Sequence, residues 1–107
     1  MSYKGWIKLH RKIQEHWLYQ EKRTFSRYEA WLDLIMMANH KDNKVLIDGE
    51  LTTVKKGQFI TSMRKLCNQW NWSNTKVTKF LELLESDGMI ERKSDTKKTV
   101  ITVVNYE

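Results

Sequence analysis

The side chains best suited to a chemical task lie in one stretch, residues 61–81, where basic and hydrogen-bonding groups occur without any acidic residue. Its cations are Arg64, Lys65, Lys76 and Lys79. Lysine and arginine neutralise phosphates, while the amide of asparagine and the hydroxyl of threonine can contact base edges. This combination predicts non-covalent recognition of a polyanion. Duplex DNA is the partner we expect, with all four cations among the contacts.

A helix from Ser73 to about Asp87 is expected to position part of this chemistry, because its apolar residues recur at i, i+3, i+4 and i+7 along one face. Ser73 is a favourable N-cap, and Gly88 follows the last turn as a C-terminal cap does. Acidic residues begin only at Glu82, as expected for a helix whose N-terminus enters a phosphate-lined groove. For each groove-facing candidate the alternative is an ordinary solvated helix face. The candidates are Asn74, Thr75, Lys76, Thr78 and Lys79.

The elements around this helix follow the order of a winged helix-turn-helix. A shorter helix capped by Ser62 runs to Trp70, and a break separates it from the helix that begins at Ser73. After Gly88 come a short apolar segment, a basic loop and the β-branched run 99–104, which favours a strand. Basic residues of this hairpin, the wing, are predicted to contact backbone phosphates or the minor groove, with a solvated turn as the alternative. They are Arg92, Lys93, Lys97 and Lys98.

Two further helices are expected before this unit. Apolar residues four positions apart predict a helix over residues 6–19, with Leu9, Ile13 and Trp17 on one face. Ser26 and Glu29 have the spacing of a capping box, which predicts the start of a core helix that continues to about residue 39.

A small hairpin and a short connection complete the predicted fold. Asp48-Gly49 predicts a β-hairpin over residues 45–54, because both residues tolerate the positive φ angles of a tight turn. Residues 58–60 form a short apolar segment that leads into the next helix. The expected fold class is α+β, a winged helix-turn-helix with an added N-terminal helix and a small β-hairpin. It forms a single domain over residues 1–107, with the helix-turn-helix at about 62–87 and the wing at about 89–104.

Composition excludes several other classes of protein. The chain has 107 residues, a net charge of +6, no proline and one cysteine, so it is long enough to bury a core and has no internal disulfide. A single cysteine favours a reducing cytoplasm. No apolar run is long enough for a membrane helix, so no membrane partner is expected.

Residues that could support catalysis or metal binding are isolated. His10, His16 and His40 lack metal-ligand spacing, and Cys67 is expected to be a small buried hydrophobe. We therefore expect no enzyme activity, no cofactor and no metal. Trp70 and Trp72 are expected to seal the helix-turn-helix corner against the core, with a stacking platform for single-stranded bases as the alternative.

Four segments of the chain closely resemble one family, the N-terminal winged-helix domain of DnaD-like phage replication proteins, also called replisome organisers. The resemblance covers residues from about 5 to 106, and its motifs are specific in residue identity and spacing. The segments are GWIKLHRKIQEHWLY, FSRYEAWLDLIMMANHKDNKV, VKKGQFITSMRKL and WNWSNTKVTKFLELLESDGMIER.

The resemblance implies a role in phage or prophage replication initiation, with origin DNA as a partner. In the family's terms, residues 73–87 match the recognition helix and residues 92–98 match the wing. It also implies contact with host helicase-loading proteins, through a region absent from this chain. Two alternatives stay open. One is a protein-interaction or homo-oligomerisation scaffold of the primosome, and the other is a phage transcriptional regulator of the same fold.

Overall fold

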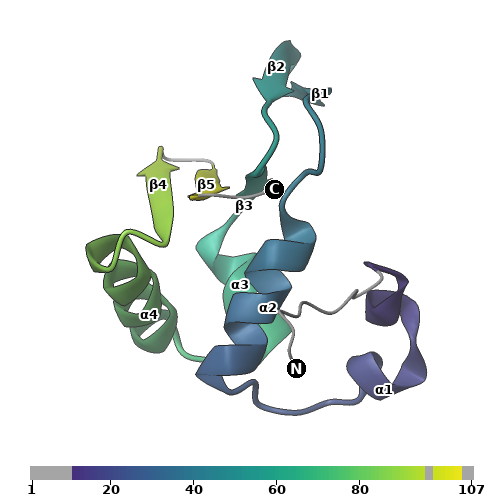
Figure 1. The fold of residues 1–107 in the computed structure, drawn as a ribbon, viewed down its shortest axis with the longest axis vertical. Coiled ribbons are helices and arrows are strands. Elements are labelled where there is room, and N and C mark those ends of the chain that lie inside the picture. The colour runs from purple at the N-terminus through teal and green to yellow at the C-terminus, as the bar shows by residue number, and fades with distance from the viewer. Residues whose placement is uncertain (1–10, 96–97, 105–107) are drawn as a thin grey trace, which may run out of the picture.

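The computed structural model describes residues 11–95 and 98–104, which form an α+β domain (Figure 1). Its helices are a short 3-10 helix η1 (Arg11–Glu15) and α-helices α1 (Trp17–Gln20), α2 (Arg27–Met37), α3 (Met63–Trp70) and α4 (Asn74–Ser86). Its strands are β1 (Asn43–Ile47), β2 (Glu50–Val54), β3 (Gln58–Thr61), β4 (Ile90–Ser94) and β5 (Thr99–Val103). None of the described helices has the length and apolar character needed to cross a membrane.

The strands form two separate antiparallel sheets. β1 and β2 make the predicted hairpin, which projects away from the helices, and its turn residues Asp48 and Gly49 have φ angles of 50° and 81° (Figure 1). The second sheet has the order β3-β5-β4, with Phe59 of β3 opposite Ile101 of β5. The prediction for residues 58–60 was incomplete, because this short segment is a strand whose partner lies about 40 residues later in the chain.

Local capping fixes the helix ends close to where the sequence predicts them. At α2 the Ser26 Oγ accepts from the Glu29 N–H and the Glu29 carboxylate accepts from the Ser26 N–H, which confirms the capping box. The bond from the Ser26 N–H is the largest cause of a lowered pKa of Glu29. The Ser73 Oγ accepts from the Lys76 N–H at 3.1 Å. After α4, Gly88 takes a φ of 74° and the Met89 N–H closes the last turn on the Leu84 carbonyl.

The core joins the helices through a cluster of aromatic rings. Trp70 is fully buried and Trp72 is 6% exposed, and each packs edge to face against Phe80 of α4. The Trp72 indole donates to the Phe25 carbonyl at 2.8 Å, and the Phe25 N–H donates to the Trp70 carbonyl at 3.0 Å. The expected sealing role of the two tryptophans is confirmed. These bonds also fix the start of α2 against the turn between α3 and α4.

The predicted helix over residues 6–19 is wrong within its described part, and residues 6–10 lie outside the described range. Instead of one continuous helix there are η1 and α1, separated at His16, whose backbone is extended and whose Nδ1 accepts from the Leu18 N–H. Trp17 is 66% exposed, so it does not share a buried face with Ile13. Tertiary hydrogen bonds explain the interruption, because Gln14 and Tyr19 both donate to Asp33 of α2.

Asp33 is a buried carboxylate that joins three parts of the fold. It has no exposed surface, and it accepts from Gln14 and Tyr19 on one oxygen and from Gln69 and Trp70 of α3 on the other. The N-terminal segment and α3 are therefore fixed to α2 at the same point. A buried charge of this kind is stable only where hydrogen bonds replace its hydration.

Candidate nucleic-acid interface

The first turns of α4 present most of the predicted groove-facing residues to solvent. Asn74, Thr75, Lys76 and Lys79 are exposed, while Val77 between them is fully buried against the core. Thr78 is half-buried, and its hydroxyl lies 3.5 Å from the Asn74 side-chain oxygen. The structure therefore gathers these five candidates along one exposed region of a single helix.

Lys76 contacts an aromatic ring, whereas Lys79 is exposed and has no partner among the described residues. The Lys76 Nζ lies 4.4 Å from the centre of the Trp72 ring, which is a cation–π distance. Trp72 is itself anchored through its indole N–H, so the Lys76 ammonium has a defined position at the start of α4. No bond joins the Lys79 ammonium to the described part of the chain, so its charge is available to an external anion.

The two candidate cations of α3 lie on the neighbouring helix. Arg64 and Lys65 occupy its first turn and are exposed, directly after the N-cap Ser62, whose Oγ accepts from the Lys65 N–H. Among the described residues, no hydrogen bond or ion pair joins their side chains to the candidates on α4. They add positive charge to the helix that precedes α4.

The wing candidates have different environments. Arg92 lies on β4 and forms a 3.0 Å ion pair with Glu85 of α4, which leaves 19% of its side chain exposed. Lys98 forms a 3.0 Å ion pair with Asp95. Lys93 is exposed, and Lys97 lies outside the described residues. Two of the expected phosphate contacts are thus already paired with carboxylates. Arg92 is paired because β4 packs beside the acidic end of α4, and Lys98 is paired with a residue three positions before it.

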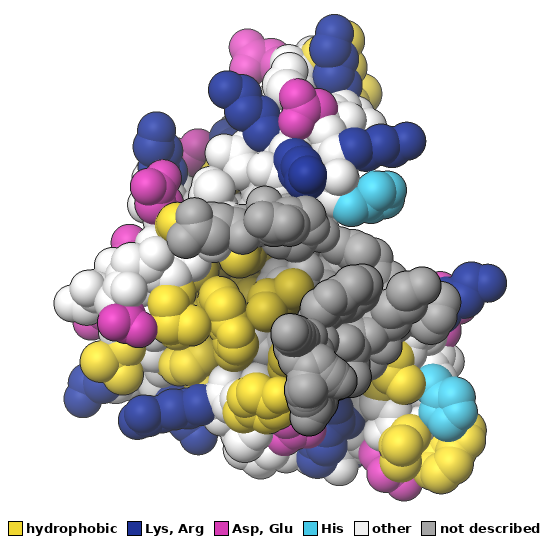
Figure 2. Space-filling view, in the orientation of Figure 1, with side chains coloured by type: hydrophobic (Ala, Val, Ile, Leu, Met, Phe, Trp, Pro, Cys, Tyr) yellow, Lys and Arg dark blue, Asp and Glu magenta, His cyan; other side chains and the backbone are white. Residues whose placement is uncertain are grey.

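Arg27 is a cation that the sequence analysis missed. It is the first residue of α2, is exposed, and lines a cleft together with Lys76 and Lys79 of α4. The capping box next to it predicted the helix start, but no local pattern relates residue 27 to residues about 50 positions later. Figure 2 shows Lys and Arg side chains along the lower left edge of the molecule, where α2 and α4 begin.

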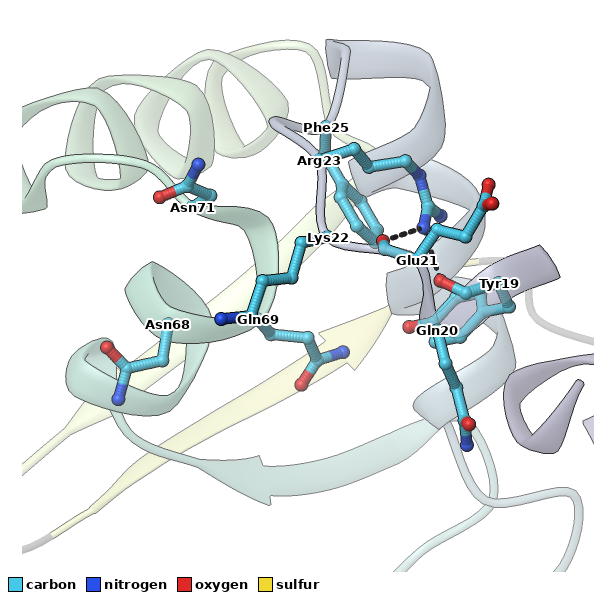
Figure 3. A pocket seen from close by; sticks show the side chains of 9 residues that line it. All are labelled: Tyr19, Gln20, Glu21, Lys22, Arg23, Phe25, Asn68, Gln69 and Asn71. Atoms are coloured by element: carbon cyan, nitrogen blue, oxygen red, sulfur yellow. Dashed lines mark hydrogen bonds between the residues drawn. The ribbon is translucent and has the colours of Figure 1, made fainter. Parts of the chain in front are cut away.

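A second hollow, beside the loop between α1 and α2, is occupied by structural contacts (Figure 3). Arg23 donates to the carbonyls of Tyr19 and Glu21 and forms a 3.0 Å ion pair with Glu29. On the α3 side, the Asn71 amide donates to Thr24 at 3.0 Å. Arg23 and Asn71 thus hold the loop in place. Within residues 11–95 and 98–104, no three His, Cys, Asp or Glu side chains are grouped as a metal site.

Comparison with known proteins adds no family assignment. No family model, no curated protein and no solved structure matches the chain. The function is therefore inferred from the geometry described above together with the resemblance noted in the sequence.

Proposed function

We propose that the chain is a winged-helix DNA-binding module of a phage or prophage replication initiation protein, acting in the bacterial cytoplasm. The observation that carries the DNA-binding part is the exposed start of α4, where Lys76 and Lys79 lie among hydrogen-bonding side chains. Within α4, the first acidic residue is Glu82. The order α3, tight turn, α4 and then the β4–β5 hairpin supports the winged-helix description.

The proposed mechanism is non-covalent. α4 enters the major groove with its first turns, where Lys76 and Lys79 neutralise phosphates and Asn74, Thr75 and Thr78 contact base edges. Lys93 of the β4–β5 hairpin contacts the neighbouring backbone. The replication role comes from the family resemblance, because the same contacts would also serve a transcriptional regulator. The preferred DNA site distinguishes these two roles.

A fluorescence-anisotropy titration of a labelled random duplex at several salt concentrations tests this proposal. We expect binding that weakens steeply with salt, because each phosphate contact releases condensed counterions. Absence of binding even at low salt contradicts the proposal. A competition series with origin-derived and unrelated duplexes then tests the replication role.

The β1–β2 hairpin favours a second candidate function, a scaffold module that associates with itself. Leu46 and Leu51 face each other across the hairpin and are 70% and 72% exposed, an unusual placement for two large apolar side chains. Replacing both leucines by aspartate is expected to lower the mass measured by sedimentation if the hairpin joins two copies. A wild-type protein that is monomeric at high concentration contradicts the scaffold function.

A further inference from the structure

A cleft of about 280 Å³ lies between the start of α2 and the first turns of α4. Three cations line it: Arg27 from α2, and Lys76 and Lys79 from α4. The rings of Trp72 and Phe80 also line it, and none of the acidic residues that the structure describes does. Three positive charges around a small hollow repel one another, and an anion placed between them removes that repulsion.

The position of Arg27 relative to Lys76 is fixed by the fold. Phe25, two residues before Arg27, is bonded through its N–H to Trp70 and through its carbonyl to the Trp72 indole. The same Trp72 ring lies under the Lys76 ammonium at 4.4 Å. The backbone that carries Arg27 and the side chain of Lys76 are therefore both joined to Trp72.

The charge of Arg27 has no internal counter-charge. Its side chain is exposed and forms no ion pair within the described residues, and the nearest carboxylate on its own helix, Glu29, is paired with Arg23. A guanidinium presents a planar fork of donors that matches a phosphate group. The cleft thus combines free positive charge with the donor geometry that phosphate requires.

We propose that this cleft holds a backbone phosphate of the duplex that binds α4, with Arg27 as its principal ligand. The proposal rests on the proposed function and extends it to a residue outside the helix-turn-helix and the wing. The ion pair of Glu85 with Arg92 places β4 on one flank of α4, whereas Lys76 and Leu83 line the cleft on the other. Arg27 and Lys93 then contact the backbone on opposite sides of the same helix.

An acidic protein segment is the competing occupant. A neighbouring groove along α4 shares Arg27, Phe80 and Leu83 with the cleft, on the face between α4 and α2 where hydrophobic side chains gather (Figure 2). Its other lining residues are the apolar Leu84 and Met89, together with Ser86 and Asp87 at the end of α4. A protein segment would use that apolar part. A phosphate needs only the cationic end, and that end coincides with the exposed start of α4. The charge distribution therefore favours the phosphate.

Substitution of Arg27 tests the proposal in the full chain. Loss of one phosphate contact lowers the slope of log affinity against log salt by about 0.9 and weakens duplex binding about eightfold at 0.1 M salt. We expect both changes for Arg27→Ala and only a small loss for Arg27→Lys, which keeps the charge. Lys44→Ala on the β1–β2 hairpin removes the same charge away from the cleft and is the matched control.

The outcomes separate this inference from the proposed function. If wild-type protein binds duplex DNA with a salt-dependent affinity but Arg27→Ala has the wild-type slope, the phosphate site is wrong and the cleft is left to a protein partner. An equal loss for Lys44→Ala also overturns it, because net charge alone then explains the effect. If wild-type protein does not bind duplex DNA, the proposed function fails together with this inference.

Discussion

Replacing Asp33 by asparagine tests whether one buried carboxylate holds three parts of the fold together. One carboxylate oxygen accepts from the Tyr19 hydroxyl at 2.6 Å and from the Gln14 amide at 3.0 Å. The other accepts from the Trp70 indole at 2.8 Å and from the Gln69 amide. All four partners donate to Asp33, and the Trp70 indole can do nothing else, so a carboxylate with two acceptor oxygens suits the site.

Asparagine has the same shape as aspartate but only one acceptor oxygen. The Trp70 indole can only donate, so the asparagine oxygen is held on the side of α3 and the NH2 group faces Gln14 and Tyr19. There the Gln14 amide must turn over and the Tyr19 hydroxyl must reverse to accept, and a partner that does not reorient is left unpaired. The bonds that remain are made to a neutral group rather than to a charged one. Each hydrogen bond to a charged group contributes about 1.5–3 kcal/mol, and each buried donor left unpaired costs about 1–3 kcal/mol. Asparagine avoids burying a charge, which offsets part of this loss. We expect the free energy of unfolding to fall by about 2–4 kcal/mol, a large part of the about 5–15 kcal/mol typical of a domain.

Urea unfolding followed by tryptophan fluorescence measures this change, because Trp70 lies at the site. Asp87→Asn is the control, since Asp87 is exposed at the end of α4 and its substitution is expected to change stability by less than about 0.5 kcal/mol. An Asp33→Asn protein with the wild-type urea midpoint would refute the reasoning. It would show that the four hydrogen bonds to the carboxylate stabilise the fold no more than a neutral amide at the same position does.

Two further predictions concern the interface and the same buried cluster. Replacing Lys76 and Lys79 together by alanine is expected to lower the slope of log affinity for duplex DNA against log salt by about 1.8, at about 0.9 for each lost phosphate contact. Replacing Lys41 and Lys44, in and next to the β1–β2 hairpin, by alanine is the control and is expected to leave this slope unchanged. Equal slopes for both double variants would contradict the assignment of the α4 face. For Tyr19, burial and then the adjacent Asp33 acceptor raise the pKa to about 12, so the unfolded chain loses this proton first, near pH 10. The free energy of unfolding of wild type should therefore exceed that of Tyr19→Phe by less and less as pH rises from 10 to 12. Urea midpoints of the two proteins measure this difference, and a difference that stays constant over this pH range would contradict the prediction.

The helix ends and the tight turn were predictable because their causes are local. Ser26 and Glu29 satisfy each other's backbone within one turn, and Ser73 does the same for the first amides of α4. Asp48-Gly49 and Gly88 adopt positive φ angles that few other residues tolerate. Each signal lies within about four residues of the feature it predicts.

The elements that were not predicted depend on distant partners. β3 has only four residues, too few to show a periodic pattern, and it is a strand because it pairs with β5. The N-terminal segment has the spacing of one helix, but it is interrupted at His16 where Gln14 and Tyr19 turn toward Asp33. Nothing local marks Asp33 as buried. The other acidic residue of the same helix, Glu29, belongs to the capping box and is bonded near the surface.

The candidate interface shows the same division between local and distant causes. The sequence correctly predicted that the start of α4 is basic and largely exposed, but it could not distinguish cations that are free from cations that are paired. Arg92 is paired with Glu85 and Lys98 with Asp95, whereas Arg27, Lys76 and Lys79 line one cleft that has no carboxylate among its described lining residues. Unpaired charges rather than residue counts determine where an anion is attracted. Among the described candidates, the unpaired cations of α4 therefore lie on the flank that faces α2, whereas Arg92 and Lys98 of the β4–β5 hairpin are paired with carboxylates.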